Sequence, residues 1–568
     1  MQRLEAKSVN GHTYYYLSQW GWKNGKCRRL SQTYLGKLDS FAHKLTGTAP
    51  QPQYAELLEV GRPLALWDAV KRSKLIELAD QLCPKRKQGL SPGTYLALAA
   101  VNRAMQPVSK QGLWGWLQKT ALVEHLDNVG PKALRSQRFW DNFSDLEPEQ
   151  LQALWKRLLE GVIGREAIDL SRLCYDGTNF YTFIDTFNVR SSLAQRGNNK
   201  QGRANLRQVN YGLVCAAKGQ WPLYYQVYEG NRNDSQQFGR MLGGFVEFFK
   251  SLRPQQEAPP RPTLIFDKGN NSAVNFGLID SFGLDYVGSV KLCEVPELAA
   301  VSNSRDGPWQ QCSGIEGTKA FRVRRKLYGQ ERDLVVSWSE GLFQAQRATL
   351  EAELTKALAK LGDLKEVLER RRQGLVKCGR RPTAERVRKQ AQEMLRREHL
   401  NMVVEIEVKS GDGQVPVLDY RIDSEGLEKL EDTFLGKTVL VTSQTRWTDS
   451  EVIEAYRSQY LIEDIFRQMK DRELGCWWPM YHWTDWMIQV HGFYCTVALL
   501  LRAMVAEAAR AAGIQLPIGR LWSELAGIGK VVNVYEGAGA GAKQVRQNVR
   551  TKLTVEQEQL MEALRLRI

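Results

Sequence analysis

Two aspartates follow apolar segments that we expect to be neighbouring strands of one sheet. Asp176 comes where the first of these strands is expected to end, after Leu173-Cys174-Tyr175, and Asp267 closes the segment 263–266. A half-buried carboxylate at the end of an apolar strand is costly without a cation, so two of them on one sheet indicate a shared metal ion. Asp267 precedes Lys268-Gly269 and is also compatible with a simple turn. Each aspartate alone therefore carries little weight, and the pair carries more.

A third carboxylate lies in a segment with helical spacing. Tyr456, Gln459, Glu463, Arg467 and Lys470 recur at steps of three and four residues, so on one long helix from residue 449 they line one face. The alternative interpretation is a solvated stripe in which Glu463 and Arg467 form an ordinary helical ion pair. Spacing alone leaves both interpretations open.

The elements that would hold the two aspartates are predicted from the switch in pattern after residue 167. Three strand-like segments at 168–183, 209–217 and 221–230 precede a helix, the strand 263–267, a second helix and the strand 286–290. Three meandering strands followed by a helical crossover to a strand beside the first are the layout of a ribonuclease-H-like sheet. The predicted fold class is therefore α/β with a mixed sheet of this type.

A helical stretch further along the chain carries a short heptad seam with a basic end. Leucine or alanine recurs from Leu350 to Leu368 at alternating steps of four and three. Arg371, Arg380 and Arg381 follow it, and Pro382 breaks the helix. This pattern predicts an antiparallel helical hairpin with a basic tip.

The overall charge is that of a protein with a polyanionic partner. The 568 residues include 79 Lys and Arg against 63 Asp and Glu, a net charge of +16. A solvated basic surface is the alternative, and charge does not decide between them. The nine cysteines show no zinc-ligand spacing, and the first residues lack an apolar signal core. These features predict a cytoplasmic protein with reduced thiols and no membrane association.

Four motifs in order resemble those of the DDE transposases of bacterial insertion sequences. Tyr456, Glu463 and Lys470 match the type and spacing of the Tyr-x2-Arg-x3-Glu-x6-Lys signature, in which Gln459 stands at the arginine position. Upstream, Asp176-Gly-Thr, Gly230-Asn-x-x-Asp and Asp267-Lys-Gly resemble the family's remaining motifs. The long segment between Asp267 and Glu463 resembles the strand-rich insertion of one branch of this superfamily.

The resemblance implies a catalytic triad of Asp176, Asp267 and Glu463 that holds two Mg²⁺ ions, with Mn²⁺ able to substitute. It implies cleavage at transposon ends and strand transfer into target DNA, by a homodimer bound to terminal inverted repeats, in the bacterial cytoplasm with the nucleoid. DNA contacts are expected from the following residues: Tyr456, Gln459, Arg467, Lys470, Trp447, Arg371, Arg380 and Arg381. A catalytically silent DNA-binding protein and another ribonuclease-H-like nuclease are the alternatives.

The resemblance and the patterns together predict the domain order. A β-hairpin unit around Lys23-Asn24-Gly25 is expected at 1–50 and a helical DNA-binding domain at 51–165. The ribonuclease-H-like catalytic domain is expected in two parts, and the other segments are an insertion and a tail. The expected ranges are 166–299 and 449–512 for the catalytic parts, 300–448 for the insertion with strands and a basic helical hairpin, and 513–568 for a helical, basic tail.

Overall fold

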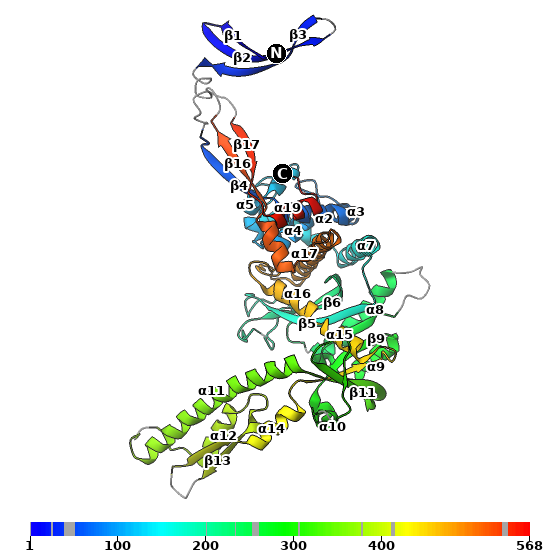
Figure 1. Cartoon of the computed structure of the whole chain (residues 1–568), viewed down its shortest axis with the longest axis vertical. Coiled ribbons are helices and arrows are strands. Elements are labelled where there is room, and N and C mark those ends of the chain that lie inside the picture. Colours follow the sequence, from blue (N-terminus) through cyan, green and yellow to red (C-terminus); the bar gives the residue numbers. More distant parts are fainter. Residues whose placement is uncertain are drawn as a thin grey trace. The chain divides into compact units, whose positions relative to one another are not determined.

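The computed structural model describes residues 2–23, 26–38, 51–199, 201–232, 234–252, 261–304, 307–376, 379–409, 415–536 and 544–567. The chain forms two compact units (Figure 1). The first consists of Met1–Leu64, Gly115–Leu126 and Pro517–Ile568, and the second of Ala65–Trp114 and Asp127–Leu516. Each is described by itself.

The first unit begins with a small antiparallel sheet. Its strands are β1 (Gln2–Val9), β2 (His12–Lys23) and β3 (Lys26–Lys37), with β2 in the centre. The predicted hairpin of β2 and β3 is confirmed, and β1 extends it by one strand that the sequence analysis did not include. The turn residues Asn24 and Gly25 lie outside the described residues.

The first unit also contains a sheet whose strands come from both ends of the chain. β16 (Gly529–Tyr535) pairs antiparallel with β4 (Tyr54–Glu59) and with β17 (Val545–Arg550). The prediction of helical structure at residues 54–59 is therefore wrong. The prediction of a helical tail is also wrong for β16 and β17, which are strands. Leu58, Val532 and Val534 bury one another there and stabilise the sheet. The sequence did not predict this contact, because Leu58 lies far from the two valines along the chain. The helices α18 (Ile518–Ala526) and α19 (Val555–Ala563) pack on each other in the same unit.

The second unit is built on a nine-stranded sheet. Its strand order is β10-β11-β12-β15-β9-β8-β5-β6-β7. The meander of β5 (Arg172–Tyr181), β6 (Gln208–Ala216) and β7 (Pro222–Glu229) is antiparallel, and β8 (Thr263–Phe266) and β9 (Asp285–Val290) continue it parallel to β5. The predicted order of strands is confirmed by this half of the sheet.

Helices supply the crossovers and cover this sheet. α8 (Asp234–Leu252) joins β7 to β8, and α9 (Ala273–Phe282) joins β8 to β9. α17 (Asp485–Ala511) packs on β7 and on α4 (Pro92–Met105). Among the described helices, α17 alone is long and apolar enough to cross a membrane, and 94% of its apolar window is buried inside the protein. This burial identifies α17 as a core helix.

The remaining helices of the N-terminal half are mostly short. They are α2 (Gly61–Ser73), α3 (Leu75–Leu82), α5 (Leu113–Leu117), α6 (Ser136–Ser144) and α7 (Pro148–Glu166). Ser91 caps α4 by accepting from the Thr94 amide, and Glu147 and Gln150 form a capping box on α7. These helices lie between Gly61 and Glu166, before the large sheet in the sequence.

Four strands of the expected insertion extend the main sheet. β11 (Thr318–Leu327) and β12 (Gln330–Ser339) form a hairpin, with the two-residue β10 (Gln310–Gln311) at its edge. β15 (Lys437–Thr442) pairs with both β12 and β9. The insertion and the predicted catalytic sheet therefore share one hydrogen-bonded ladder, because β15 supplies the edge that joins them. The short helix α10 (Pro296–Ala299) precedes these strands.

A helical subdomain lies between β12 and β15. α11 (Glu340–Arg372) packs on α12 (Ala384–Met394) and on the hairpin of β13 (Val404–Lys409) and β14 (Val417–Ile422). The helices α13 (Leu400–Val403) and α14 (Ser424–Thr433) complete it.

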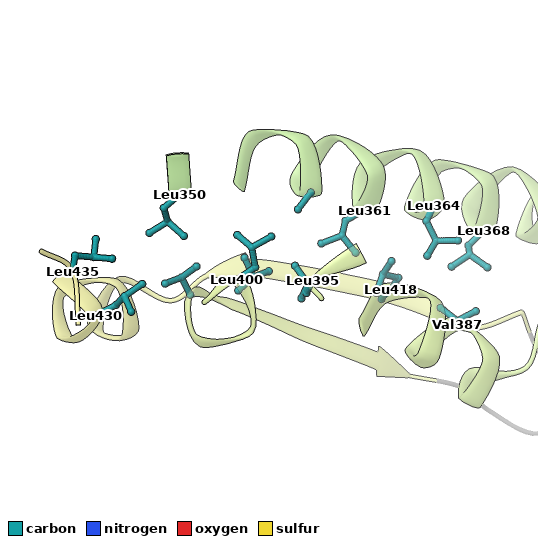
Figure 2. Close-up of a cluster of buried hydrophobic side chains, with 14 residues drawn as sticks. Leu350, Leu361, Leu364, Leu368, Val387, Leu395, Leu400, Leu418, Leu430 and Leu435 are labelled. Atoms are coloured by element: carbon teal, nitrogen blue, oxygen red, sulfur yellow. The ribbon is translucent and has the colours of Figure 1, made fainter. Parts of the chain in front are cut away.

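The core of this subdomain contains the heptad seam of α11. Figure 2 shows Leu361, Leu364 and Leu368 pointing from α11 toward Leu395 and Leu418. The seam is buried as predicted, but its partner is a short helix together with a β-hairpin and not a second long helix. The reason is that α12 has 11 residues against 33 in α11, so strands cover the rest of the seam.

Candidate active site

The register of two neighbouring parallel strands holds Asp176 and Asp267 level with each other. β5 and β8 pair from Arg172 with Thr263 to Tyr175 with Phe266, and each aspartate is the next residue along its own chain. Residues at matching positions on adjacent parallel strands point to the same side of a sheet. The two carboxylates are thus neighbours, as the sequence analysis expected.

Asp176 does not end its strand. β5 continues to Tyr181, because β6 pairs with β5 as far as Tyr181 whereas the shorter β8 stops at Phe266. The prediction that the strand ends at Asp176 is therefore wrong. Only the pairing of β5 with β8 stops there, at Tyr175, directly before Asp176. The Asp176 Oδ1 atom accepts a hydrogen bond of 2.7 Å from the amide of Gly177.

Asp267 is oriented by two hydroxyl groups. The Ser289 Oγ atom on β9 donates to the Asp267 Oδ1 atom at 2.9 Å, and the Tyr456 hydroxyl donates to the same oxygen at 3.2 Å. The Ser289 Oγ atom also accepts the amide of Lys268 at 3.0 Å. These bonds fix the carboxylate at the end of β8, and sequence reasoning did not find Ser289.

The predicted long helix is two helices. α15 (Asp449–Arg457) and α16 (Tyr460–Lys470) are separated at Ser458 and Gln459. Gln459 is buried, and its Nε2 atom donates to the backbone oxygen of Tyr175 at 3.3 Å, which ties the junction to β5 immediately before Asp176. The prediction that these residues share one helix face is therefore wrong, because Gln459 points into the protein whereas Glu463 and Arg467 are exposed.

Glu463 lies near Tyr456 but does not complete a cluster. Burial, with the carboxylates of Asp267 and Glu463 nearby, raises the pKa of the Tyr456 hydroxyl, so this group remains a proton donor. Among the described residues, no three histidine, cysteine or acidic side chains come together as a metal site. The two aspartates supply the hard oxygen donors that fit a divalent cation.

The other residues of the α16 helix take separate roles. Lys470 donates through Nζ to the hydroxyl of Thr178, two residues beyond Asp176, and lies 5.8 Å from the Phe180 ring centroid. Arg467 donates to Asp464, the pair that forms in place of the Glu463 pair considered from sequence. Lys470 is thus tied to the strand of the first aspartate.

The remaining predicted DNA-contacting residues lie away from the aspartates. The half-buried Trp447 ring is covered by the Arg172 guanidinium, 4.6 Å from its centroid, and its backbone oxygen accepts from Arg322 at 2.7 Å. Arg371 lies in the last turn of α11, and Arg380 and Arg381 are exposed just before α12. The arginines gather at the tip of the helical subdomain, as predicted, and Trp447 packs on a cation.

One family model covers the part of the chain that contains these residues. The family model described as "Transposase DDE domain" matches residues 169–500, which is more than half of the chain and includes both aspartates and Glu463.

The chain belongs to the transposase DDE domain family.

It is accordingly an enzyme that acts on DNA, a transposase that carries out DNA transposition. The comparison with curated proteins gives no match. Among solved structures, the cryo-EM structure of the piggyBac transposase synaptic complex with hairpin DNA is similar at 9% identity, over 84% of this chain and 82% of that one, with a TM-score of 0.36. The family assignment therefore rests on the family model and not on this structure.

Proposed function

We propose that this transposase cuts the ends of a bacterial insertion sequence and joins them to target DNA, with Asp176, Asp267 and Glu463 as its catalytic carboxylates. The observation that carries the proposal is the β5 and β8 register, which makes Asp176 and Asp267 neighbours in a sheet of the expected order. The family assignment supports the DNA chemistry. Glu463 is included among the catalytic carboxylates because it lies on α16, the helix that follows Tyr456.

Divalent cations are part of the proposal. Asp176, Asp267 and Glu463 would hold two Mg²⁺ ions, for which Mn²⁺ would substitute. Such ions activate a hydroxyl nucleophile and stabilise the leaving oxygen of a phosphodiester. Glu463 is exposed and lies near Tyr456, which bonds to Asp267, so it is the carboxylate of α16 that we propose for the third position.

The protein's own groups would prepare the aspartates for this chemistry. Tyr456 and Ser289 both donate to the Asp267 Oδ1 atom, which orients the carboxylate. Lys470 would contact a DNA phosphate close to Thr178, and Arg467 would contact the backbone from the exposed face of α16. We propose that Gln459 positions the β5 backbone, because its buried side-chain amide donates to the backbone oxygen of Tyr175.

Surfaces beyond the site would hold the DNA. The tip formed by Arg371, Arg380 and Arg381 carries the charge expected for contact with flanking or partner-bound DNA. Trp447 would stack on an extruded base only if the Arg172 guanidinium moves away from its ring. The N-terminal unit and the helical region before the sheet would bind the terminal inverted repeats as double-stranded DNA.

The proposal extends to assembly and location. Coordinated cutting needs both ends held together, so a homodimer on DNA is expected, in the cytoplasm of a bacterium and associated with its nucleoid. The basic net charge of +16 supports a large polyanionic partner.

A cleavage assay tests the proposed catalytic residues. Purified protein would be incubated with Mg²⁺ and duplex DNA that carries the sequences flanking its coding region, beside Asp176→Asn, Asp267→Asn and Glu463→Gln. Because each variant removes one anionic ligand, cleavage is expected to fall at least about 100-fold, since metal ions contribute several kcal/mol to such reactions.

The matched control is Glu454→Gln, which makes the same change at an exposed position on α15. It should cut like the wild type. The catalytic assignment fails if any of the three variants cuts as well as Glu454→Gln, or if the wild type binds this DNA and never nicks it.

A further inference from the structure

The N-terminal sheet of β1, β2 and β3 has no hydrophobic core of its own. Its described residues contribute no hydrophobic side chain to the buried core, and Leu4, Trp22, Leu30 and Tyr34 are each about half exposed or more. A three-stranded sheet normally needs a covered apolar face to be stable. Surface of this kind therefore indicates a partner, and the chemistry of its two faces says which partner fits.

One face of this sheet is basic and aromatic, and we call it the tyrosine face. Its aromatic members pack together: Tyr34 lies against Tyr14 and Tyr16, with ring centroids 6.0 and 5.3 Å apart. Lys7 lies 5.1 Å from the Tyr16 centroid, and Lys37 lies 6.0 Å from the Tyr14 centroid. Cations and rings thus alternate across all three strands.

Glu5 arranges three side chains on the tyrosine face. Its carboxylate accepts from the Trp20 indole at 3.1 Å, from Gln32 at 3.2 Å and from Arg29 at 3.5 Å. The bond to Arg29 uses one of the five N–H donors of the guanidinium. Arginine and glutamine are side chains that recognise guanine and adenine edges in pairs of hydrogen bonds. Glu5 therefore presents two base-reading groups side by side.

Nearly all charged residues of these strands are basic. Glu5 is the single acidic residue in 2–38, and the range contains seven lysines and arginines: Arg3, Lys7, Lys23, Lys26, Arg28, Arg29 and Lys37. The opposite face carries Leu4, Leu17 and Leu30, which the ladder places away from Glu5. Four of these seven cations, Arg3, Lys7, Arg29 and Lys37, lie on the tyrosine face by the register of the strands.

We infer that the tyrosine face binds duplex DNA, with the small sheet entering the major groove. The major groove, about 12 Å wide, admits a β-ribbon. Arg29 and Gln32 would meet base edges, while Lys7 and Lys37 would meet phosphates on either side. This inference rests on the proposed function, and it assigns base contacts at the element ends to β1–β3.

Two adjacent arginines provide a matched test. Arg29 faces Trp20 across the β2–β3 ladder, and Arg28 faces Gly21, so the neighbours point to opposite faces. Full-length Arg29→Gln and Arg28→Gln would be compared by fluorescence anisotropy on a labelled duplex containing the DNA that flanks the coding region. Arg29→Gln should weaken binding about 10-fold, because a paired base contact is lost, and Arg28→Gln less than about twofold.

Controls keep the test independent of folding and catalysis. Lys37→Gln, whose removed charge lies over Tyr14, should weaken binding to every duplex and lower the salt dependence by about one phosphate contact. The inference is overturned if Arg28→Gln and Arg29→Gln weaken binding equally, if neither does, or if single-stranded DNA of the same sequence competes better than duplex. Asp176→Asn should bind like the wild type, so a failure to cut and a failure to bind are separable.

Discussion

The two large β-structures of this transposase differ in what their side chains bury. In the nine-stranded sheet, β6 is buried along its whole length, and β8 contributes Phe266 with no exposed surface. The N-terminal sheet contributes no hydrophobic side chain to the core within 2–38. A sheet buried on both sides fixes carboxylates by register, whereas an exposed basic sheet presents side chains to a partner. The contrast indicates that one sheet holds the chemistry and the other the DNA.

The largest expected effect is on the stability of the buried sheet. Phe266 packs against Phe238 and Phe276, with ring centroids 5.2 and 5.8 Å away, directly before Asp267. Phe266→Ala should lower the free energy of unfolding by about 3–5 kcal/mol through loss of buried area and the cavity left behind. Chemical denaturation followed by tryptophan fluorescence measures this. A loss below about 1 kcal/mol would mean that the sheet is not the rigid support described above.

The next effect concerns the segment that follows β5. Asp485, at the start of α17, accepts bonds from Ser191 Oγ at 2.8 Å and from the amides of Ser192 and Leu193 at 2.9 Å each. Asp485→Ala should cost about 2 kcal/mol, a value reduced for partial exposure. The matched change Asp363→Ala, at an exposed position of α11, should change the free energy of unfolding by less than about 0.5 kcal/mol.

The same bonds predict a pH dependence. Although burial opposes it, hydrogen bonding from Ser192 and Leu193 lowers the pKa of Asp485 below its ordinary value of 3.8. A carboxyl whose pKa is lower in the folded protein stabilises it above the unfolded pKa, and this contribution is lost as pH falls through the folded pKa. The stability difference between wild type and Asp485→Ala should therefore be constant near neutral pH and shrink below pH 3.8. A difference that grows in acid would contradict this account.

How far the sequence predicts this contrast depends on the range of the interactions. The β5 and β8 strands and their aspartates were predictable, because alternation and strand order are local patterns that a common sheet brings together. The role of Gln459 was not, since helical spacing does not reveal a break at Ser458 that turns this side chain onto Tyr175. Pairing of β4 with β16 joins residues at opposite ends of the chain, and no local pattern in Tyr54–Glu59 indicates it.

A smaller effect is expected at the site itself. Tyr456→Phe removes the 3.2 Å bond to Asp267 and leaves the Ser289 bond in place. A typical hydrogen bond contributes about 1 kcal/mol, so the cleavage rate should fall about fivefold with DNA affinity unchanged. Rates at saturating DNA separate the two quantities. If affinity falls and the rate does not, Tyr456 contacts DNA and does not orient the carboxylate.

The smallest effect is expected on the N-terminal sheet. Leu30 is 55% exposed, on the side of β3 away from Glu5. Leu30→Ala should change the free energy of unfolding by less than about 0.5 kcal/mol, and its affinity for duplex DNA should equal that of the wild type. A large loss of stability would show that this sheet is covered within the protein, which would remove the contrast between the two sheets.

Metal rescue tests the central claim most directly. Asp267→Cys replaces a hard oxygen ligand by a thiolate, which favours softer ions than Mg²⁺. Cleavage by this variant should be absent in Mg²⁺ and partly restored in Mn²⁺, while Glu454→Cys, at an exposed position of α15, cuts in both ions. Full activity of Asp267→Cys in Mg²⁺, or no recovery in Mn²⁺ when the variant is folded and binds DNA, would contradict the assignment of Asp267 as a metal ligand.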